Sequence, residues 1–227
     1  MSAKILNGKE IAHDIFDEVY IKVSELKKSG WQPMLLSIKV GENPAVDLYI
    51  RNQRKKAEQV GIVFEEKQFP EDISLNVLLA AIASFNVDPK VTGIILQRPA
   101  PKKIPIKSLQ KAIHPLKDVE GMHPASIGNI VYNELELGPC TAIASVELLR
   151  RTGKDLKGLE VVVIGHSEIV GKPIAFLLMA EGATVTVCHH MTKDFTVHSK
   201  NADAVFVAVG KPNLITGNML KPGATLI

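Results

Sequence analysis

The sequence has only two cysteines, no long apolar run and little excess charge, and each absence excludes a class of protein. Cys140 and Cys188 stand far apart without a CxxC pair, which argues against a disulfide framework or a cysteine-based zinc site. A formal net charge of +3 is too small to indicate nucleic-acid binding. No stretch reaches the ~20 apolar residues that span a bilayer, and the amino terminus lacks the apolar core of a signal peptide. We therefore expect a cytoplasmic protein with neither a membrane nor a nucleic-acid partner.

Apolar residues recur in patterns that predict strands alternating with helices along the whole chain. With 227 residues, the chain is long enough for one large or two modest domains. The predicted helices cover residues 8–29, 44–60, 75–85, 106–113, 141–153 and 169–180. The predicted strands cover residues 34–40, 62–69, 91–96, 161–164, 183–188, 204–209 and 224–227. Such alternation is typical of parallel sheets flanked by helices. A long irregular stretch, residues 97–128, carries only the helix predicted at residues 106–113.

The stretch VVVIGHSEIVGKP, Val161 to Pro173, predicts a site for a phosphate-bearing ligand. Four apolar residues form a strand buried on both faces, which runs into Gly165, Ser167 and Gly171. Glycines at this point let the backbone approach an anion, and the next helix presents free N–H groups to it. The spacing is not GxGxxG, so an ordinary strand–turn–helix joint remains an alternative.

Polar residues stand at two further places where a ligand is expected. Tyr49, Gln53 and Lys56 share one face of the helix predicted at residues 44–60, which a solvated surface would also explain. Gln97 directly follows a buried strand, at the carboxyl end where open α/β sheets bind ligands. A loop-stabilising amide is the alternative for Gln97.

The segment from His114 to Pro124 holds two acids, Asp118 and Glu120. They can bind hydrogen-bond donors of a substrate, or they can cap and solvate a turn. His114, His123 and His166 fit no familiar ligand spacing, so the sequence predicts no metal site.

Together these segments closely resemble one family in collinear order over essentially all 227 residues. The segments are VGENPA…Y, GIILQRPAP, IHPLKDVEGMHPASIG, GPCTA, VVIGHSEIVGKP, ATVTVCH and ADAVFVAVGKP. They resemble the methylenetetrahydrofolate dehydrogenase/methenyltetrahydrofolate cyclohydrolase family. The resemblance implies two α/β lobes with a cleft between them, a folate-binding catalytic lobe at residues 1–140 and a Rossmann-like NAD(P)-binding lobe at residues 141–227. It also implies a tetrahydrofolate derivative as substrate, NADP or less often NAD as cofactor, and a homodimer.

The resemblance also implies roles for individual residues. Tyr49 matches the residue that stacks on and orients the folate, and Gln97 matches a pocket glutamine beside the catalytic base. The implied cofactor-binding residues are Gly165, His166, Ser167, Ile169, Gly171, Pro173, His190, Gly210, Lys211 and Pro212.

Several residues depart from the family pattern. Gln53 stands where the family has the lysine that transfers a proton in the cyclohydrolase step, and Lys56 is a candidate substitute although it is turned about 60° away on the helix. Glu120 replaces the folate-binding aspartate. His166 stands where Arg or Ala is usual in the glycine turn. The family's later glycine-rich segment and last helix have no counterpart before Ile227, so we expect the second lobe to be incomplete at its C-terminal end.

The chemistry indicates which activity these departures threaten. Transfer of a hydride from methylenetetrahydrofolate to nicotinamide needs positioning but no protein proton carrier. Hydrolysis of the methenyl product needs an activated water and a proton carrier, and an amide cannot serve. The sequence therefore predicts a dehydrogenase whose cyclohydrolase activity is weak or lost. The alternatives are a non-catalytic relative that binds folate or nucleotide or serves as an assembly subunit, and a fully bifunctional enzyme.

The choice of cofactor depends on the end of the strand at residues 183–188. His189 and His190 follow it, and no acid stands there to bind a ribose 2′-hydroxyl, which favours NADP. Neutral histidines bind phosphate less well than arginine does, so NAD remains the alternative.

Overall fold

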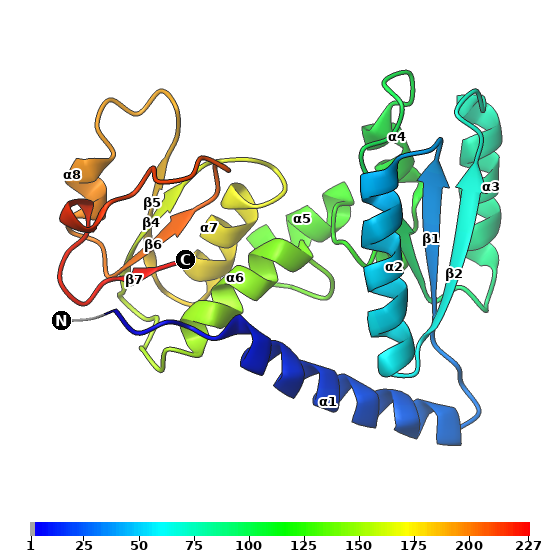
Figure 1. Ribbon diagram of the computed structural model, residues 1–227, viewed down its shortest axis with the longest axis horizontal. Helices are drawn as coiled ribbons and strands as arrows, with labels where there is room; N and C mark the ends of the chain where they lie inside the picture. Colours follow the sequence, from blue (N-terminus) through cyan, green and yellow to red (C-terminus); the bar gives the residue numbers. More distant parts are fainter. Residues whose placement is uncertain (1–2) are drawn as a thin grey trace. The chain divides into compact units, whose positions relative to one another are not determined.

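Strands and helices alternate to form two separate parallel sheets in the computed structural model of the chain, which describes residues 3–227 (Figure 1). Residues Asn7–Pro124 form one unit, called here the N-terminal unit. Residues Ala125–Ile227 form the other, the C-terminal unit, which also includes residues 3–6. The expected α/β fold with parallel sheets is confirmed.

The two units meet in sequence at Pro124, earlier than the boundary expected after residue 140. A helix that the sequence analysis missed, α5 (Pro124–Val131), explains the difference. Its residues Ile127 and Ile130 pack into the apolar core of the C-terminal unit. This helix therefore folds with the sheet that follows it in the chain.

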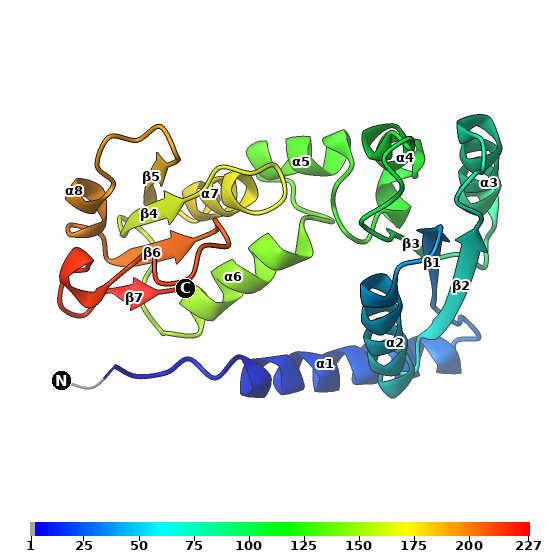
Figure 2. The ribbon, with the colours of Figure 1, turned by 45° about the horizontal axis from the view of Figure 1, so that its top comes forward.

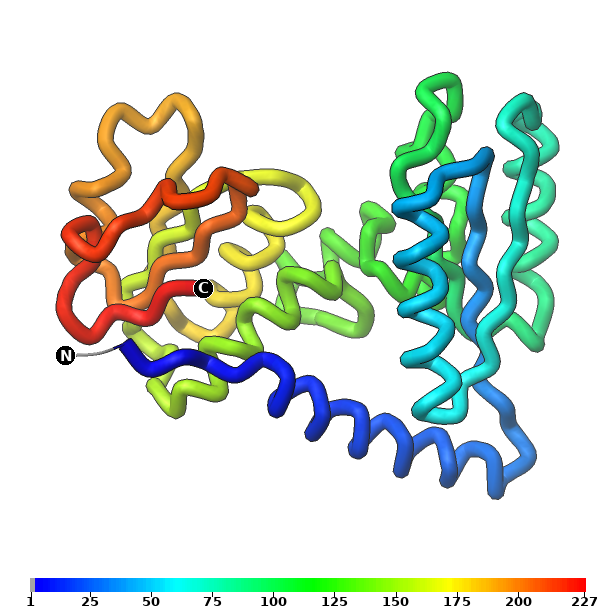
Figure 3. The backbone as a smooth tube through the Cα atoms, viewed as in Figure 1, coloured from blue at the N-terminus to red at the C-terminus, as the bar shows by residue number. Residues whose placement is uncertain are grey.

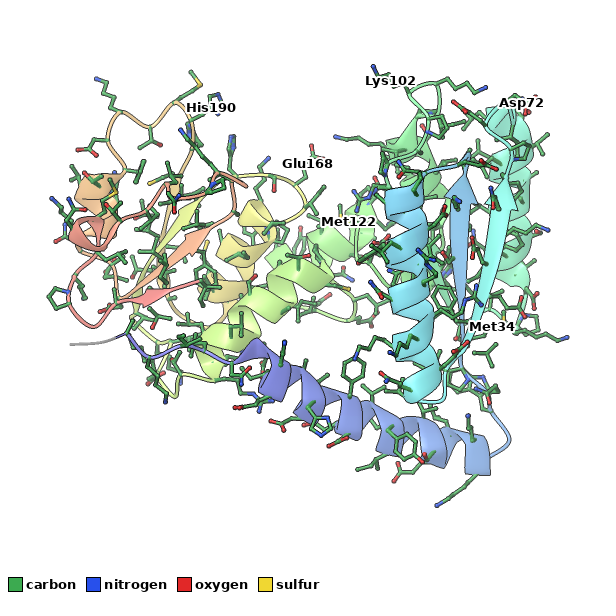
Figure 4. All side chains as sticks on the ribbon, viewed as in Figure 1. Met34, Asp72, Lys102, Met122, Glu168 and His190 are labelled. Carbon is green, nitrogen blue, oxygen red and sulfur yellow. The ribbon has the colours of Figure 1, made fainter. Side chains whose placement is uncertain are left out.

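The N-terminal unit contains a three-stranded parallel sheet in the order β2-β1-β3. The strands are β1 (Met34–Val40), β2 (Val63–Phe69) and β3 (Gly93–Leu96). The helices are α1 (Gly8–Lys28), α2 (Pro44–Gln59), α3 (Leu75–Val87) and α4 (Ile106–Ala112), followed by the 3₁₀ turn η1 (Pro115–Lys117). In Figure 4, Met34 marks the start of β1, and Asp72 and Lys102 mark loops at the carboxyl end of the sheet.

Residues at the helix starts account for where α2 and α3 begin. The Asn43 side chain accepts hydrogen bonds from the backbone N–H groups of Ala45 and Val46, and Pro44 occupies the first turn, where its missing N–H is not needed. Ser74 accepts in the same way from Val77. Asn and Ser are both preferred helix N-caps, and each lies directly before a helix predicted at residues 44–60 or 75–85.

The two faces of β1 differ in character. Leu36, Ile38 and Val40 belong to the apolar layer shared with α3 and α4. Ser37 and Lys39 alternate with them and so point to the opposite face, which α2 covers. Both polar residues are buried. The layer beneath α2 therefore contains polar groups that must find partners there.

The C-terminal unit contains a four-stranded parallel sheet in the order β5-β4-β6-β7 (Figure 2). Its strands are β4 (Glu160–Ile164), β5 (Thr184–Cys188), β6 (Ala204–Val207) and β7 (Thr225–Leu226). Its remaining helices are α6 (Cys140–Arg150), α7 (Gly171–Ala180), α8 (Thr196–Ser199) and the 3₁₀ turn η2 (Gly217–Met219).

Strand β4 is buried on both faces, as expected. Val161 and Val163 pack in the layer with α6 and α7, and Val162 and Ile164 pack on the other face. After β6 the chain returns along the sheet, and β7 then pairs with β6 in parallel (Figure 3). Leu226 on this edge strand is 47% exposed. Among residues 3–227, no helix is long and apolar enough to cross a membrane.

Candidate active site

Three buried or half-buried side chains from different elements meet beneath α2. The Gln97 amide nitrogen donates to Ser37 Oγ at 2.9 Å and to Gln53 Oε1 at 2.7 Å. Gln97 follows β3 and is only 4% exposed, Ser37 lies on β1 and Gln53 on α2. These three residues are called the amide network below. The sequence analysis selected Gln53 and Gln97 but not Ser37, whose only signal was a polar residue inside an apolar strand.

The other two selected residues of α2 have different surroundings. The Tyr49 side chain is 57% exposed, one helical turn before Gln53. The Lys56 ammonium lies 4.7 Å from the centre of the Phe16 ring on α1. Within the described chain, no hydrogen bond joins Lys56 to the amide network, whereas Gln53 is directed at Gln97. The geometry therefore gives Lys56 a packing contact with α1 and no role beside Gln97.

The acids of the segment after α4 have different environments. Asp118 is buried, accepts a hydrogen bond from the backbone N–H of His123 and forms a β-bridge with Ile94. It thus closes the turn. Glu120 is half-buried, and its burial raises the pKa of its carboxyl above the ordinary 4.5, although the charge of Arg98 acts in the opposite direction. Of these two acids, Glu120 is the better candidate for proton transfer, because its pKa is perturbed by its surroundings.

An ion pair that the sequence did not predict joins β1 to α2. Lys39 on β1 is buried, and its ammonium forms an ion pair and hydrogen bond with the carboxylate of Asp47 in the first turns of α2. The sequence signal was a lysine within the apolar strand MLLSIKV. Because a buried charge needs a partner, this pair fixes α2 on the sheet that carries Ser37.

The glycine turn after β4 has a geometry that requires glycine at two positions. Gly165 has φ +112°, and a Cβ there would lie 2.5 Å from the carbonyl oxygen of Ala208. A Cβ on Gly171 would lie 1.9 Å from the carbonyl oxygen of Gly165. Ser167 accepts a hydrogen bond from the backbone N–H of Val170 at 3.2 Å. Helix α7 starts at Gly171 instead of the expected residue 169. Its first residue therefore lies close to Gly165 at the end of β4.

This turn is suited to a dinucleotide. It lies at the carboxyl end of a parallel sheet, and its glycines let the end of β4, the loop after β6 and the start of α7 approach one another closely. The loop after β6 supplies Gly210, Lys211 and Pro212, all exposed. Ile169 is exposed in the turn itself. The predicted cofactor residues thus share one edge of the C-terminal sheet.

Three histidines lie together at this edge. His166 comes from the glycine turn, and His189 and His190 follow β5. The ring centre of His166 lies 4.7 Å from that of His189 and 6.1 Å from that of His190. Figure 4 labels His190 on the loop after β5 and Glu168 on the loop before α7. Sequence reasoning selected His166 and His190 as separate cofactor residues and did not single out His189.

The chain matches both domains of one protein family. The catalytic domain of tetrahydrofolate dehydrogenase/cyclohydrolase matches residues 6–120, and the NAD(P)-binding domain of the same enzyme matches residues 139–227. The bifunctional protein FolD 2 of Mesorhizobium japonicum is 62% identical over 225 residues, which span 99% of this chain and 74% of that protein.

Solved structures agree with these matches. The bifunctional FolD dehydrogenase/cyclohydrolase of Campylobacter jejuni superposes with a TM-score of 0.95 and 38% identity, over 99% of this chain and 80% of that one. The Trypanosoma brucei dehydrogenase–cyclohydrolase, solved with NADP and an inhibitor, gives a TM-score of 0.91 and 32% identity over 100% and 78%. The C-terminal unit therefore contains an NAD(P)-binding domain. The resemblance found in the sequence is confirmed, and the chain belongs to the tetrahydrofolate dehydrogenase/cyclohydrolase family.

Proposed function

We propose that the chain is a bifunctional enzyme that oxidises 5,10-methylenetetrahydrofolate with NAD(P) and hydrolyses the methenyl product. Relatives that cover nearly the whole chain carry the name of the bifunctional protein, including one that is 62% identical. These comparisons favour activity in both steps over the weak or lost cyclohydrolase predicted from Gln53. They favour it also over a non-catalytic relative, because both enzymatic domains match.

The amide network carries this proposal. Gln97 is buried at the carboxyl end of β3, where ligands of parallel sheets bind, and two hydrogen bonds fix its amide. Such a rigid amide orients the ring of a pterin through its remaining carbonyl oxygen, with exposed Tyr49 one turn along α2 available to stack on it. NAD(P), when bound, accepts the hydride. The contribution of the residues named here is therefore placement, which Gln53 does not impair.

The hydrolytic step needs a group that exchanges a proton. Neither Gln53 nor Gln97 has a usable pKa, and the ammonium of Lys56 lies over Phe16. Glu120 is a titratable group whose pKa is raised by burial above the ordinary 4.5, and a hydrogen bond with the Leu96 backbone places it next to the residue before Gln97. We assign Glu120 the role of the base that activates water, because a base with a raised pKa takes up a proton more readily at neutral pH.

Two finer points of the proposal concern the cofactor and the assembly. NADP is favoured over NAD because no acid follows β5 to bind a ribose 2′-hydroxyl. Calorimetric titration with NADP and with NAD measures this preference directly. The homodimer implied by the resemblance remains a prediction, which the sedimentation of the purified protein tests.

Measurement of the two half-reactions separately tests the function. Methylenetetrahydrofolate should support reduction of NADP or NAD, and methenyltetrahydrofolate should be hydrolysed faster than in buffer. Binding of cofactor and folate without either turnover would support the non-catalytic alternative. Reduction without hydrolysis would support the dehydrogenase that the sequence alone predicts.

A further inference from the structure

The histidine cluster, formed by His166, His189 and His190, gathers three potential metal ligands on the C-terminal unit. One ring nitrogen of each lies within 4.8 Å of those of the other two. The rings come from two loops that are separated by more than twenty residues, which is why sequence spacing did not indicate a site. His166 and His190 are exposed, so an ion from solution can reach them.

The backbone around the cluster is held in place before any ion binds. The N–H of Gly165 donates to the carbonyl oxygen of Cys188 at 2.8 Å, which joins the two loops where they leave β4 and β5. His189 and Thr192 exchange two hydrogen bonds of 2.9 Å, one between backbone groups and one through the threonine hydroxyl. Therefore only side-chain movements are needed to bring the ligands together.

The distances fit coordination after a small adjustment. Zinc–nitrogen bonds of about 2.0–2.1 Å in a tetrahedron place ligand nitrogens about 3.3 Å apart, so the rings must approach one another by at most about 1.5 Å. Exposed side chains make such rotations at low cost. The His189 ring also accepts a 3.2 Å hydrogen bond at Nδ1 from the N–H of Met191. Coordination through Nε2 keeps this bond, whereas coordination through Nδ1 replaces it.

We propose that the histidine cluster binds one divalent transition-metal ion, with Zn²⁺ as the probe that represents the class. Imidazole nitrogen is a preferred ligand of zinc, copper, nickel and cobalt, whereas Mg²⁺ and Ca²⁺ prefer oxygen. Three histidines occupy three positions of a tetrahedron and leave the fourth open to water or to an anionic oxygen. The site depends on the geometry of these rings alone and not on turnover of any folate.

Metal titration of the untagged, chelator-treated protein tests the proposal. Zn²⁺ titrated in a calorimeter should bind with one equivalent per chain, and Co²⁺ should give visible absorption bands that Zn²⁺ abolishes. The variants His166→Gln and His190→Gln should each lower the affinity about tenfold or more, since even groups that only support a ligand contribute 10–100-fold. His13→Gln, a change at an exposed histidine of α1, is the matched control and should leave the affinity unchanged.

Three results would overturn the proposal. The first is the absence of saturable one-to-one binding by the unsubstituted protein. The second is binding that both cluster variants retain, or that the His13 control loses equally. The third is an intense near-ultraviolet thiolate band in the Co²⁺ complex, which would assign the ion to Cys140 or Cys188. Because folate is absent from this titration, its failure is separate from a failure of the proposed function.

Discussion

Gln97 donates a 2.7 Å hydrogen bond to the side-chain carbonyl of Gln53, the residue that replaces the lysine of the family pattern. The second proton of the same amide nitrogen goes to Ser37 Oγ. Both N–H donors of the Gln97 amide are thus used, and its carbonyl oxygen remains available to accept a hydrogen bond from a ligand. If the Gln97 amide turned over, its oxygen could accept from the Ser37 hydroxyl and, in a Gln53→Lys variant, from the lysine ammonium that replaces the Gln53 carbonyl. The network is therefore compatible with a cationic donor at position 53.

Gln53→Lys should increase methenyltetrahydrofolate hydrolysis. A lysine there supplies a proton-transferring group, worth about 10²–10⁴-fold when it is well positioned, so we expect a gain of about tenfold or more in kcat. Steady-state hydrolysis at neutral pH measures it. Gln53→Met, similar in size but without a proton to transfer, is the control and should show no gain. An unchanged rate in the lysine variant would mean that the pocket is not arranged for this step.

Gln97→Ala should impair both reactions and the stability of the N-terminal unit. The substitution leaves Ser37 Oγ and Gln53 Oε1 without the amide N–H groups that donate to them. This loss should lower the free energy of unfolding by about 1–3 kcal/mol. Urea unfolding and kcat/KM for methylenetetrahydrofolate measure the two effects. Ser37→Ala keeps the bond between Gln97 and Gln53 and should reduce kcat/KM less. Equal losses in the two variants would contradict a specific role for the Gln97 amide.

Glu120 should give the hydrolytic rate a pH dependence. Because burial raises the pKa of its carboxyl above 4.5, the base form appears only as the pH rises through that raised value, and the rate should rise with it. Glu120→Gln should lower the hydrolytic rate and remove its rise with pH. Glu120→Asp should restore part of the rate and part of its pH dependence. A rising limb that persists in Glu120→Gln would assign the titration to another group.

The same group makes a prediction about stability. A carboxyl with a raised pKa binds its proton more tightly in the folded than in the unfolded chain, so its contribution to stability is present below pH 4.5. That contribution is lost as the pH rises through the folded pKa. Urea unfolding across this pH range should therefore show that the free energy of unfolding declines less with rising pH in Glu120→Gln than in the unsubstituted protein. Parallel curves would contradict the raised pKa.

The pair of Lys39 and Asp47 should respond unequally to removal of its two partners. Lys39 is nearly completely buried, whereas the Asp47 side chain is 42% exposed. Asp47→Asn leaves a buried ammonium without its counter-ion and should lower the free energy of unfolding by about 2 kcal/mol, less than a fully buried pair because of the exposure of Asp47. Lys39→Met removes the buried charge itself and should cost less. A larger loss in Lys39→Met would contradict this account.

Most elements of the fold were predictable because their signals are local. Asn43 with Pro44 marks the start of α2, and the run of β-branched residues from Val161 marks a strand buried on both faces. α5 was missed because its segment contains Pro124 and Gly128, residue types that are unfavourable in helix interiors. Its apolar residues are explained only by their packing in the core of the C-terminal unit. α8, a single turn at Thr196–Ser199, has too few residues for a periodic pattern.

The site was predictable only in part because its contacts are not local. Gln97 was selected from its place after a buried strand, but its partner Ser37 lies 60 residues earlier. Helical spacing put Lys56 near Gln53 without showing that Phe16 of another helix lies under its ammonium. His189 and His166 come together only when β4 and β5 pair. Sequence spacing carries no record of such pairings.

The progress of the complete reaction tests the central claim most directly. The purified protein is given 5,10-methylenetetrahydrofolate with NADP and, separately, with NAD, and both the reduced cofactor and the methenyl intermediate are followed by absorbance. We predict saturable cofactor reduction with no build-up of the methenyl compound beyond a low steady level. No reduction with either cofactor would contradict the dehydrogenase, and methenyl product that decays only at its rate in buffer would contradict the second activity.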